Sequence, residues 1–328
     1  MMFRFGRMKA LRFAGNNLTL DEIPMPDNRA ETLVRVVKSG ICNTDLEIVR
    51  GYAGFEGTIG HEFVGVVERS DDAPNLIGKR VIGEINAGCG GCKLCLGGDS
   101  RHCPQRTVLG IVGRDGAHAE FLTLPSRNLI EIPDNVSDEQ AVFAEPLAAA
   151  HGITEQVEIL TDTKVAVIGD GKLGLLCAMT MSLKSSNVSI IGKHRNKLKH
   201  IERCGVRSIL LADVDEQINK SFDVVIEASG SESGFATAVD LIKPRGKIVL
   251  KSTFHGNPTW QASRVVVDEI TIVGSRCGQM APVIDLLASG RIDVTGLIDD
   301  EFSLDGGIAA MDRAAEKGVL KILLSQVS

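Results

Sequence analysis

The sequence predicts an α/β protein that combines a mainly-β part with a second part built on a doubly wound parallel sheet. Three observations support this prediction. The chain has 328 residues, more than one hydrophobic core usually holds together. From residue 8 to about 130 its segments are short, β-branched and alternating in polarity. From about residue 141, continuous Val/Ile runs alternate with helical patterns, as in a parallel sheet covered on both faces.

The segments can be justified in chain order. The β segments of the first part, broken by Gly, Pro, Asn and Asp, include "ETLVRVVKSG", "FVGVVERS", "KRVIGEI" and "AEFLTLP". The second part runs through the strand "KVAVIG", the helix "KLGLLCAMTMSLKS" and the strands "NVSIIGK" and "FDVVIEASG". After Ser275 the chain is too short for a further domain, and it ends in the strand "VLKILL". We therefore expect one domain from residues 1–140 and 276–328, and another from residues 141–275.

Composition excludes several classes of partner. The formal net charge of −6 lacks the basic excess that nucleic-acid binding requires, so we expect no nucleic-acid partner. No apolar run approaches the ~20 residues that span a bilayer, so we expect no membrane segment. The leader "MMFRFGR" lacks the apolar core of a secretory signal. A cytoplasmic location is therefore expected, where disulfides are rare.

A glycine-rich loop predicts a dinucleotide site. "VAVIGDGKLGLL" places Gly169, Gly171 and Gly174 in a G-x-G-x-x-G that follows a strand and opens a helix. These glycines permit the tight turn, the approach of a pyrophosphate, and close packing of helix on strand. Lys172 and Leu173 stand in the first turn of that helix, whose free N–H groups and dipole favour an anion. A tight turn alone would also explain the glycines, but the βαβ context favours dinucleotide binding.

The end of the second strand bears on the choice between NAD and NADP. NAD sites usually carry Asp or Glu there, whereas this chain has Gly192, which leaves room for a 2′-phosphate. Lys193, His194 and Arg195 follow, and the Lys and Arg side chains would neutralise that phosphate. A solvated basic helix start is the plainer interpretation, but the missing acid favours NADP(H) over NAD(H). We also include Ser229, which follows the strand "FDVVIEA", among the cofactor contacts.

A cysteine-rich lobe at about residues 88–104 predicts a structural metal site. It reads "GCGGCKLCLGGDSRHCP", in which Cys89, Cys92, Cys95 and Cys103 follow the spacing C-x2-C-x2-C-x7-C. Its glycines let the loop fold back so that four thiolates converge on one zinc ion, which leaves no position for water or substrate. An iron–sulfur cluster is the main alternative, because the first spacings and the final Cys-Pro are similar to those of bacterial ferredoxins. Unliganded thiols are the remaining one.

A second metal site is indicated by Cys42 in "SGICNTDLEI" and by His61 and Glu62 in "GTIGHEFVGVV". Cys and His are good zinc ligands, and two protein ligands plus one more leave a position open for chemistry. A buried cysteine and a core histidine would explain these residues one at a time. Beside the nucleotide loop and the four-cysteine lobe, the pattern favours a catalytic zinc.

These motifs together resemble the zinc-dependent medium-chain alcohol dehydrogenase family, also called medium-chain dehydrogenases/reductases. The similar segments run in the family's order from residue 8 to 324 and are "GICNTDLEI", "GHEFVGVV", the cysteine lobe, "AEPLAAAHG", "VIGDGKLG" and "LKILL". The resemblance implies a GroES-like catalytic domain, a Rossmann domain inserted before its last portion, and an active site in the cleft between the two domains. It also implies a homodimer or homotetramer.

The resemblance also implies a ligand set for the catalytic zinc. Cys42 and His61 match zinc ligands of the family. Glu145, in "AEPLAAAHG", stands where many alcohol dehydrogenases have a cysteine ligand, and glutamate there is similar to the polyol, sugar and threonine dehydrogenase branch. In that branch Glu62 or a water can also complete the shell. A helix-start carboxylate before Pro146 is the plainer interpretation of Glu145.

Three further residues are expected to serve proton transfer. By resemblance, Thr44 passes on the substrate proton and Asp45 orients the zinc-binding histidine. Many relatives then have a histidine that passes the proton to solvent, where this chain has Glu47. "TDLE" also fits a capping box, with Thr44 as N-cap and Glu47 at N3. Glu47 is therefore either part of the proton exit or a cap, and Thr44 is expected to be both cap and relay.

The combined prediction is a zinc-dependent oxidoreductase that transfers a hydride reversibly between a small-molecule alcohol and NADP, with one catalytic and one structural zinc per chain. Glu145 favours a polyol, sugar or hydroxy-amino-acid substrate. A non-catalytic redox sensor with the same fold is the alternative from another class, and it would bind the cofactor without turning over any alcohol or aldehyde. An iron–sulfur electron carrier is a third hypothesis, which visible colour would reveal.

Overall fold

A computed structural model of the chain describes residues 6–27, 29–215, 218–252 and 262–326. It divides into two compact units. The first unit comprises Met1–Glu145 and Met280–Ser328, and the second unit comprises Pro146–Gln279. Among the residues that the structure describes, no helix is long and apolar enough to cross a membrane.

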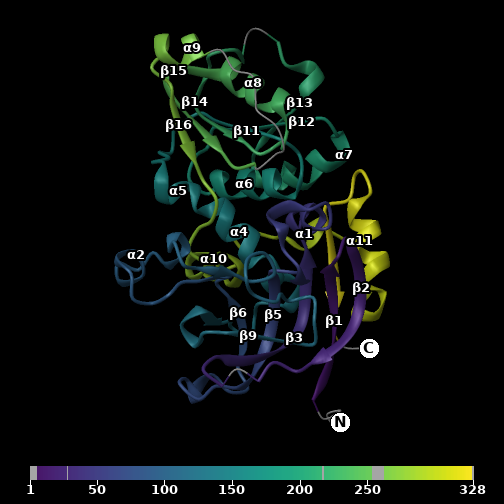
Figure 1. Ribbon diagram of the computed structural model, residues 1–328. Helices are drawn as coiled ribbons and strands as arrows, with labels where there is room; N and C mark the ends of the chain where they lie inside the picture. The colour runs from purple at the N-terminus through teal and green to yellow at the C-terminus, as the bar shows by residue number, and fades with distance from the viewer. Residues whose placement is uncertain (1–5, 28, 216–217, 253–261, 327–328) are drawn as a thin grey trace. The chain divides into compact units, whose positions relative to one another are not determined.

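Seven strands form the main sheet of the first unit: β3 (Thr32–Ile41), β5 (Glu62–Arg69), β6 (Arg80–Gly83), β9 (Phe121–Leu124), β10 (Leu129–Glu131), β17 (Ile298–Ser303) and β18 (Lys321–Ser325). Their order is β10-β6-β5-β3-β18-β17, with β9 also paired to β3. The last strand, β18, is antiparallel to β3 and parallel to β17. Figure 1 labels β3, β5, β6 and β9 of this sheet. In this register Leu323 lies opposite Gly40, and Gly40 lies opposite Glu62, so three distant segments meet.

Smaller elements complete the first unit. A second sheet has the order β2-β1-β4, and a two-stranded ribbon pairs β7 with β8. These strands are β1 (Arg7–Ala14), β2 (Asn17–Pro24), β4 (Gly57–Thr58), β7 (Asn86–Ala87) and β8 (Thr107–Val108). The helices are α1 (Asn43–Ile48), α2 (Lys93–Leu96), α3 (Asp138–Val142), α10 (Ala281–Ala288) and α11 (Gly307–Ala315), while α4 (Ala144–His151) runs across the boundary between the units. One buried apolar cluster joins the two sheets with α11 and includes Leu11, Ile41, Met311 and Ile322.

The second unit is a six-stranded, wholly parallel sheet with helices. Its strands are β11 (Val165–Ile168), β12 (Val188–Gly192), β13 (Arg207–Leu210), β14 (Phe222–Glu227), β15 (Ile242–Leu250) and β16 (Thr271–Gly274), and its helices are α5 (Ile153–Gln156), α6 (Lys172–Ser182), α7 (Arg195–Leu198), α8 (Glu232–Leu241) and α9 (Ala262–Val267). The spatial order is β13-β12-β11-β14-β15-β16, and all strands are parallel. From β11 the chain first builds outward to one edge through β12 and β13, and then to the other edge through β14, β15 and β16. This reversal between β11 and β14 defines a doubly wound sheet, and ligands bind there at the carboxyl ends of the strands.

The predicted α/β class is confirmed in both units, and the sequence pattern explains why. Every residue of β11 and β12 is buried, as the continuous Val/Ile runs predict for a sheet covered on both faces. In the first unit β1 alternates buried and partly buried residues along much of its length, which is typical of a half-covered antiparallel strand.

Candidate active site and metal centres

The glycine loop lies at the carboxyl end of β11 in the second unit. Gly169 has a φ of +115°, and a Cβ atom there would lie 2.6 Å from the carbonyl oxygen of Ala228. A Cβ atom on Gly174 would collide with the carbonyl oxygen of Gly169, so α6 can pack this closely only with glycine. Gly171 is the N-cap of α6, and a Cβ atom there would meet nothing within 4 Å. The loop therefore has the backbone form that a pyrophosphate site requires.

Other predicted cofactor residues surround this loop. Lys172 and Leu173 form the first turn of α6. Ser229 follows β14, and its Cα would lie 2.9 Å from a Cβ on Gly169, so it directly adjoins the loop. Its hydroxyl donates to the buried carboxylate of Glu227 at 2.6 Å. The structure thus brings the predicted residues of β11, α6 and β14 to one place in the second unit.

The end of β12 holds a residue that the sequence analysis missed. Lys193 and Arg195 are exposed, as expected of a basic helix start. The space beside Gly192, however, is filled by the carboxylate of Asp170, whose Oδ2 would lie 2.7 Å from a Cβ on Gly192. His194 contacts the same carboxylate through its backbone N–H. The acid within the "GDG" of the glycine motif was the available sequence signal.

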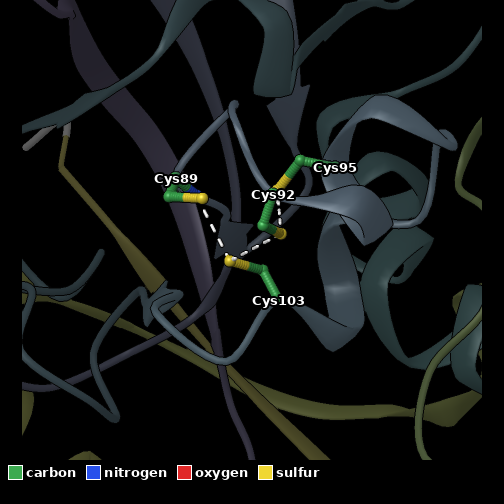
Figure 2. A group of neighbouring side chains, drawn as sticks. All are labelled: Cys89, Cys92, Cys95 and Cys103. Carbon is green, nitrogen blue, oxygen red and sulfur yellow. Dashed lines mark hydrogen bonds between the residues drawn. The ribbon is translucent and has the colours of Figure 1, made fainter.

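The four lobe cysteines converge in the first unit. One sulfur from each of Cys89, Cys92, Cys95 and Cys103 lies within 4.8 Å of the others. Figure 2 shows them around a common space, with the Sγ of Cys92 3.7 Å from that of Cys103. Arg127 donates to the carbonyl of Gly88 at 2.9 Å and so ties the lobe to the sheet region.

The electrostatics of the lobe favour the thiolate at Cys89, Cys92 and Cys103, because the pKa of each of these three is lowered. Backbone N–H groups of Gly91 and Cys92 hold the pKa of Cys89 below its ordinary value, and the backbone of Cys89 does the same for Cys103. Burial instead raises the pKa of Cys95 to about 11. Four sulfur donors around one point fit a tetrahedral zinc ion, because thiolate is the form that binds metal.

A second convergent group lies between β3 and β5. Cys42, His61 and Glu62 each offer a ligand atom within 4.8 Å of the others. His61 is 3% exposed and Glu62 is fully buried, yet Oε1 of Glu62 has no hydrogen-bond partner among the described residues. Burying such an atom unpaired is costly, so the group fits a metal ion as the missing partner of Glu62. Thr44 adjoins it, with its Oγ1 3.8 Å from the sulfur of Cys42.

Glu145 is close to this group without being one of its members. Its ligand atoms do not fall within the 4.8 Å that unites Cys42, His61 and Glu62. Burial, with a smaller contribution from Glu62, raises the pKa of Glu145 to about 7, and the charge of His61 opposes the rise. Glu145 is thus a second carboxyl in the electrostatic field of the group.

Asp45 is the residue around which this region is organised. It is fully buried, and its two oxygens accept from the backbone N–H groups of Cys42 at 2.8 Å and Gly60 at 3.1 Å. Its Oδ1 also lies 3.4 Å from Nδ1 of His61. Burial alone would raise the pKa of Asp45, but the neighbouring histidines hold it well below its usual range. Asp45 is therefore a carboxylate that fixes the ring of His61.

A second buried histidine, His118, was given no role by the sequence analysis. Its Nε2 lies 3.6 Å from Oδ2 of Asp45, and its Nδ1 lies 2.9 Å from the hydroxyl of Ser39. A Cβ atom on Gly60, whose φ is +98°, would lie 2.6 Å from the His118 ring. Only the fold joins these residues, since Ser39 and His118 are 79 positions apart.

The predicted capping box is wrong. Helix α1 begins at Asn43 with Cys42 as its N-cap, and Asp45, not Glu47, occupies N3 and accepts from the N-cap N–H. The carboxylate of Asp45 accepts the N–H of Cys42 and also that of Gly60, and this second hydrogen bond holds it in the capping position. Glu47 instead pairs with Arg50 at 2.7 Å, with 24% of its side chain exposed.

Glu62 is held on its other side by a lysine from the last strand. Lys321 and Glu62 are both fully buried and form an ion pair. The Nζ of Lys321 also lies 3.4 Å from the carbonyl oxygen of Ile41 and 5.4 Å from the centre of the Phe143 ring. A Cβ atom on Gly40 would lie 2.5 Å from Oε2 of Glu62, so glycine in β3 makes room for this pair.

Comparison with known proteins finds the family that the sequence motifs resemble, and the match extends over nearly the whole chain. The family model described as alcohol dehydrogenase GroES-like domain matches residues 28–134, and the one described as zinc-binding dehydrogenase matches residues 173–289. An L-threonine 3-dehydrogenase of Chelativorans sp. (strain BNC1) is 31% identical over 338 residues, covering 95% of this chain and 97% of that protein.

Solved structures agree at the level of the fold. A short chain alcohol dehydrogenase from Escherichia coli CFT073, complexed with NADH, matches with a TM-score of 0.90 and 27% identity, covering 98% of this chain and 99% of that one. A chain from Sinorhizobium meliloti 1021, described as a zinc-binding dehydrogenase and bound to NADP, matches with a TM-score of 0.88 and 27% identity, covering 97% and 99%.

Fold and comparisons together define an oxidoreductase of the zinc-binding dehydrogenase class. The chain belongs to the zinc-dependent medium-chain dehydrogenase family, in its polyol and threonine dehydrogenase branch. The family resemblance found in the sequence is thereby confirmed.

Proposed function

We propose that this enzyme transfers a hydride reversibly between an alcohol and NADP(H), and that the alcohol is a polyol, a sugar or a hydroxy-amino acid. The observation that carries the proposal is the group of Cys42, His61 and Glu62, whose ligand atoms lie within 4.8 Å of one another beside Thr44. The substrate class is supported by Glu145 in place of a cysteine and by a relative named L-threonine 3-dehydrogenase.

Two donor groups of this chain would hold zinc. The four lobe cysteines would hold a structural ion, and Cys42, His61 and Glu62 would hold a catalytic one, with Glu145 as a further carboxylate nearby. When bound, the catalytic zinc supplies Lewis acidity at the substrate oxygen, and the nicotinamide supplies the hydride acceptor.

The chain's own side chains would carry the proton and fix the site. The hydroxyl of Thr44 would receive the alcohol proton, because it adjoins the candidate ligand Cys42. Asp45 holds the Nδ1 side of His61 and so leaves the other ring nitrogen for the metal. A role for Glu47 in proton exit stays a prediction, and in the structure Arg50 holds its carboxylate.

The preference for NADP(H) is part of the proposal. It is supported by the absence of an acid at the end of β12 itself and by the exposed side chains of Lys193 and Arg195 there. Two basic groups beside a 2′-phosphate would form charge-assisted hydrogen bonds with it. We also propose a homodimer or homotetramer, supported by the position of β16 at one edge of the second unit's sheet.

A substrate screen tests the proposed function. We expect zinc-loaded protein to oxidise at least one compound from a panel of polyols, sugar alcohols and L-threonine, with greater kcat/KM for NADP+ than for NAD+. Nicotinamide absorbance reports turnover, and the reverse reaction with the matching carbonyl compound checks reversibility. A protein that binds the dinucleotide but turns over nothing in the panel would support the redox-sensor alternative instead.

Replacing Cys92 with serine tests the structural zinc. We expect the variant to lose one of the two proposed zinc ions per chain and to unfold at lower temperature, because structural zinc sites contribute directly to folding free energy. Metal analysis by mass spectrometry and thermal unfolding would measure both effects. Cys204→Ser, a partly buried cysteine outside both donor groups, is the matched control. A Cys92→Ser protein with full zinc content and an unchanged unfolding temperature would refute a zinc site here. Visible absorbance of the parent protein would instead indicate an iron–sulfur cluster.

A further inference from the structure

The carboxylate of Asp170 occupies a place where the family of doubly wound dinucleotide sites reads the cofactor's ribose. Asp170 lies between Gly169 and Gly171 of the glycine loop, yet its side chain points to the end of β12, the neighbouring strand. If Gly192 carried a Cβ atom, that atom would lie 2.7 Å from Oδ2 of Asp170 and 2.6 Å from the Cβ of Asp170. An acid on the β12 end would therefore compete with Asp170 for the same space.

Two contacts from His194 hold this carboxylate in place. The backbone N–H of His194 donates to Oδ2 of Asp170 at 2.6 Å. The ring Nδ1 of His194 lies 3.2 Å from Oδ1 and 3.1 Å from Oδ2, so a proton on that nitrogen is shared with the carboxylate. Only 10% of the Asp170 side chain is exposed, which means that it is held at the strand end and does not swing freely in solvent.

In NAD sites a carboxylate at the end of the second strand accepts hydrogen bonds from the ribose hydroxyls. Here the strand end contributes glycine, and the glycine loop contributes the carboxylate to the same place. We propose that Asp170, positioned by His194, is the residue that discriminates at the 2′ position of the cofactor, favouring a hydroxyl and opposing a 2′-phosphate. The inference rests on the proposed function in taking a nicotinamide dinucleotide as the ligand.

The cofactor preference is then a balance of two opposed groups. Lys193 and Arg195 attract a 2′-phosphate, whereas the carboxylate of Asp170 repels it and accepts from a 2′-hydroxyl. The sequence motif alone, with its missing acid, suggests a stronger preference for NADP(H) than this arrangement allows.

Replacing Asp170 with asparagine tests the inference, because it removes the charge and keeps the size of the side chain. We expect the ratio of kcat/KM for NADP+ to that for NAD+ to rise about tenfold or more, the scale of removing one repulsion between charges a few ångströms apart. The change should appear in KM, with kcat nearly constant. Direct titration of the protein with NADPH and NADH, followed by fluorescence, should show the same shift without any turnover.

Several variants make the outcome decisive. Asp170→Ser, neutral and smaller, should shift the ratio in the same direction if the asparagine variant folds poorly. Asp162→Asn, an exposed acid before β11 and so at the other end of the parallel strands, should leave the ratio unchanged. Lys193→Ala with Arg195→Ala should lower the ratio.

Folded Asp170 variants with the parent's ratio would overturn the inference and leave the proposed function intact. A parent protein that binds neither dinucleotide would contradict both.

Discussion

Replacing Cys42 with serine is expected to reduce alcohol oxidation by at least about 100-fold while leaving dinucleotide binding unchanged. Mutating even the groups that orient a metal ligand typically costs about 10- to 100-fold in metal affinity or activity. Cys42 itself belongs to the donor group and also caps α1. The proposed cofactor contacts lie in the second unit, Pro146–Gln279, so NADPH titration should be unaffected. Steady-state kinetics and fluorescence titration would measure the two properties separately.

Metal content separates loss of a ligand from general damage in this experiment. The Cys42→Ser protein should keep the structural ion and lose or loosen the catalytic one, whereas Cys204→Ser should keep both. Thermal unfolding of the two variants should be similar, because Cys42 is only partly buried. Parent-level turnover by Cys42→Ser, with one zinc ion fewer, would show that the metal at this site has no part in the reaction.

Replacing Lys321 with methionine is expected to lower the free energy of unfolding by about 3–5 kcal/mol, the usual cost of removing one partner from a buried ion pair. Lys321 and Glu62 are both fully buried, and the variant would leave the Glu62 carboxylate without its cation. Oε1 of Glu62 has no hydrogen-bond partner among the described residues, so without a bound metal ion nothing in that part of the chain compensates. Denaturant unfolding of the parent and the variant, both without zinc and followed by circular dichroism, would measure the loss.

Two companion variants show whether the lost charge pair is the cause. Lys321→Met combined with Glu62→Gln removes both charges and should recover much of the loss. Lys79→Met removes a lysine whose ion pair with Glu131 is half exposed, and it should have little effect. A Lys321→Met protein as stable as the parent would mean that the buried pair contributes nothing, in which case Glu62 is balanced by another cation.

The sequence is most informative where a pattern is local. The spacing of the lobe cysteines fits within residues 89–103, and the structure brings all four sulfurs together. The glycine motif fits within one βα turn, and the positive φ of Gly169 is there as expected. In both cases the short loop itself determines which side chains can meet, so residue type and spacing carry most of the geometry.

Residues that meet only through the sheet could not be predicted. Lys321 and Glu62 are 259 positions apart and meet because β18 pairs with β3, which pairs with β5. His118 and Asp45 are also distant in the chain and meet only in the folded structure. The error at Thr44 has a different cause, since a valid capping pattern competed with a better one. Asp45 accepts the N–H of Cys42, so Cys42 is the N-cap residue. The contact between Asp45 and Gly60 that supports this arrangement is tertiary and is not visible in the sequence.

The place of β18 within the sheet has a consequence for the chain as it leaves the ribosome. Lys321 follows Ile41 by 280 residues, and residues 38–41 pair with β18. At about 5–20 residues per second, that part of β3 stays unpaired on one side for roughly 15–60 s during translation. The continuous stretch Pro146–Gln279 is completed earlier and can fold while the rest of the chain waits. During translation the protein therefore exposes an unpaired edge of β3, which can pair with other chains and aggregate. Slower synthesis of the segment that ends in β18 lengthens this exposure.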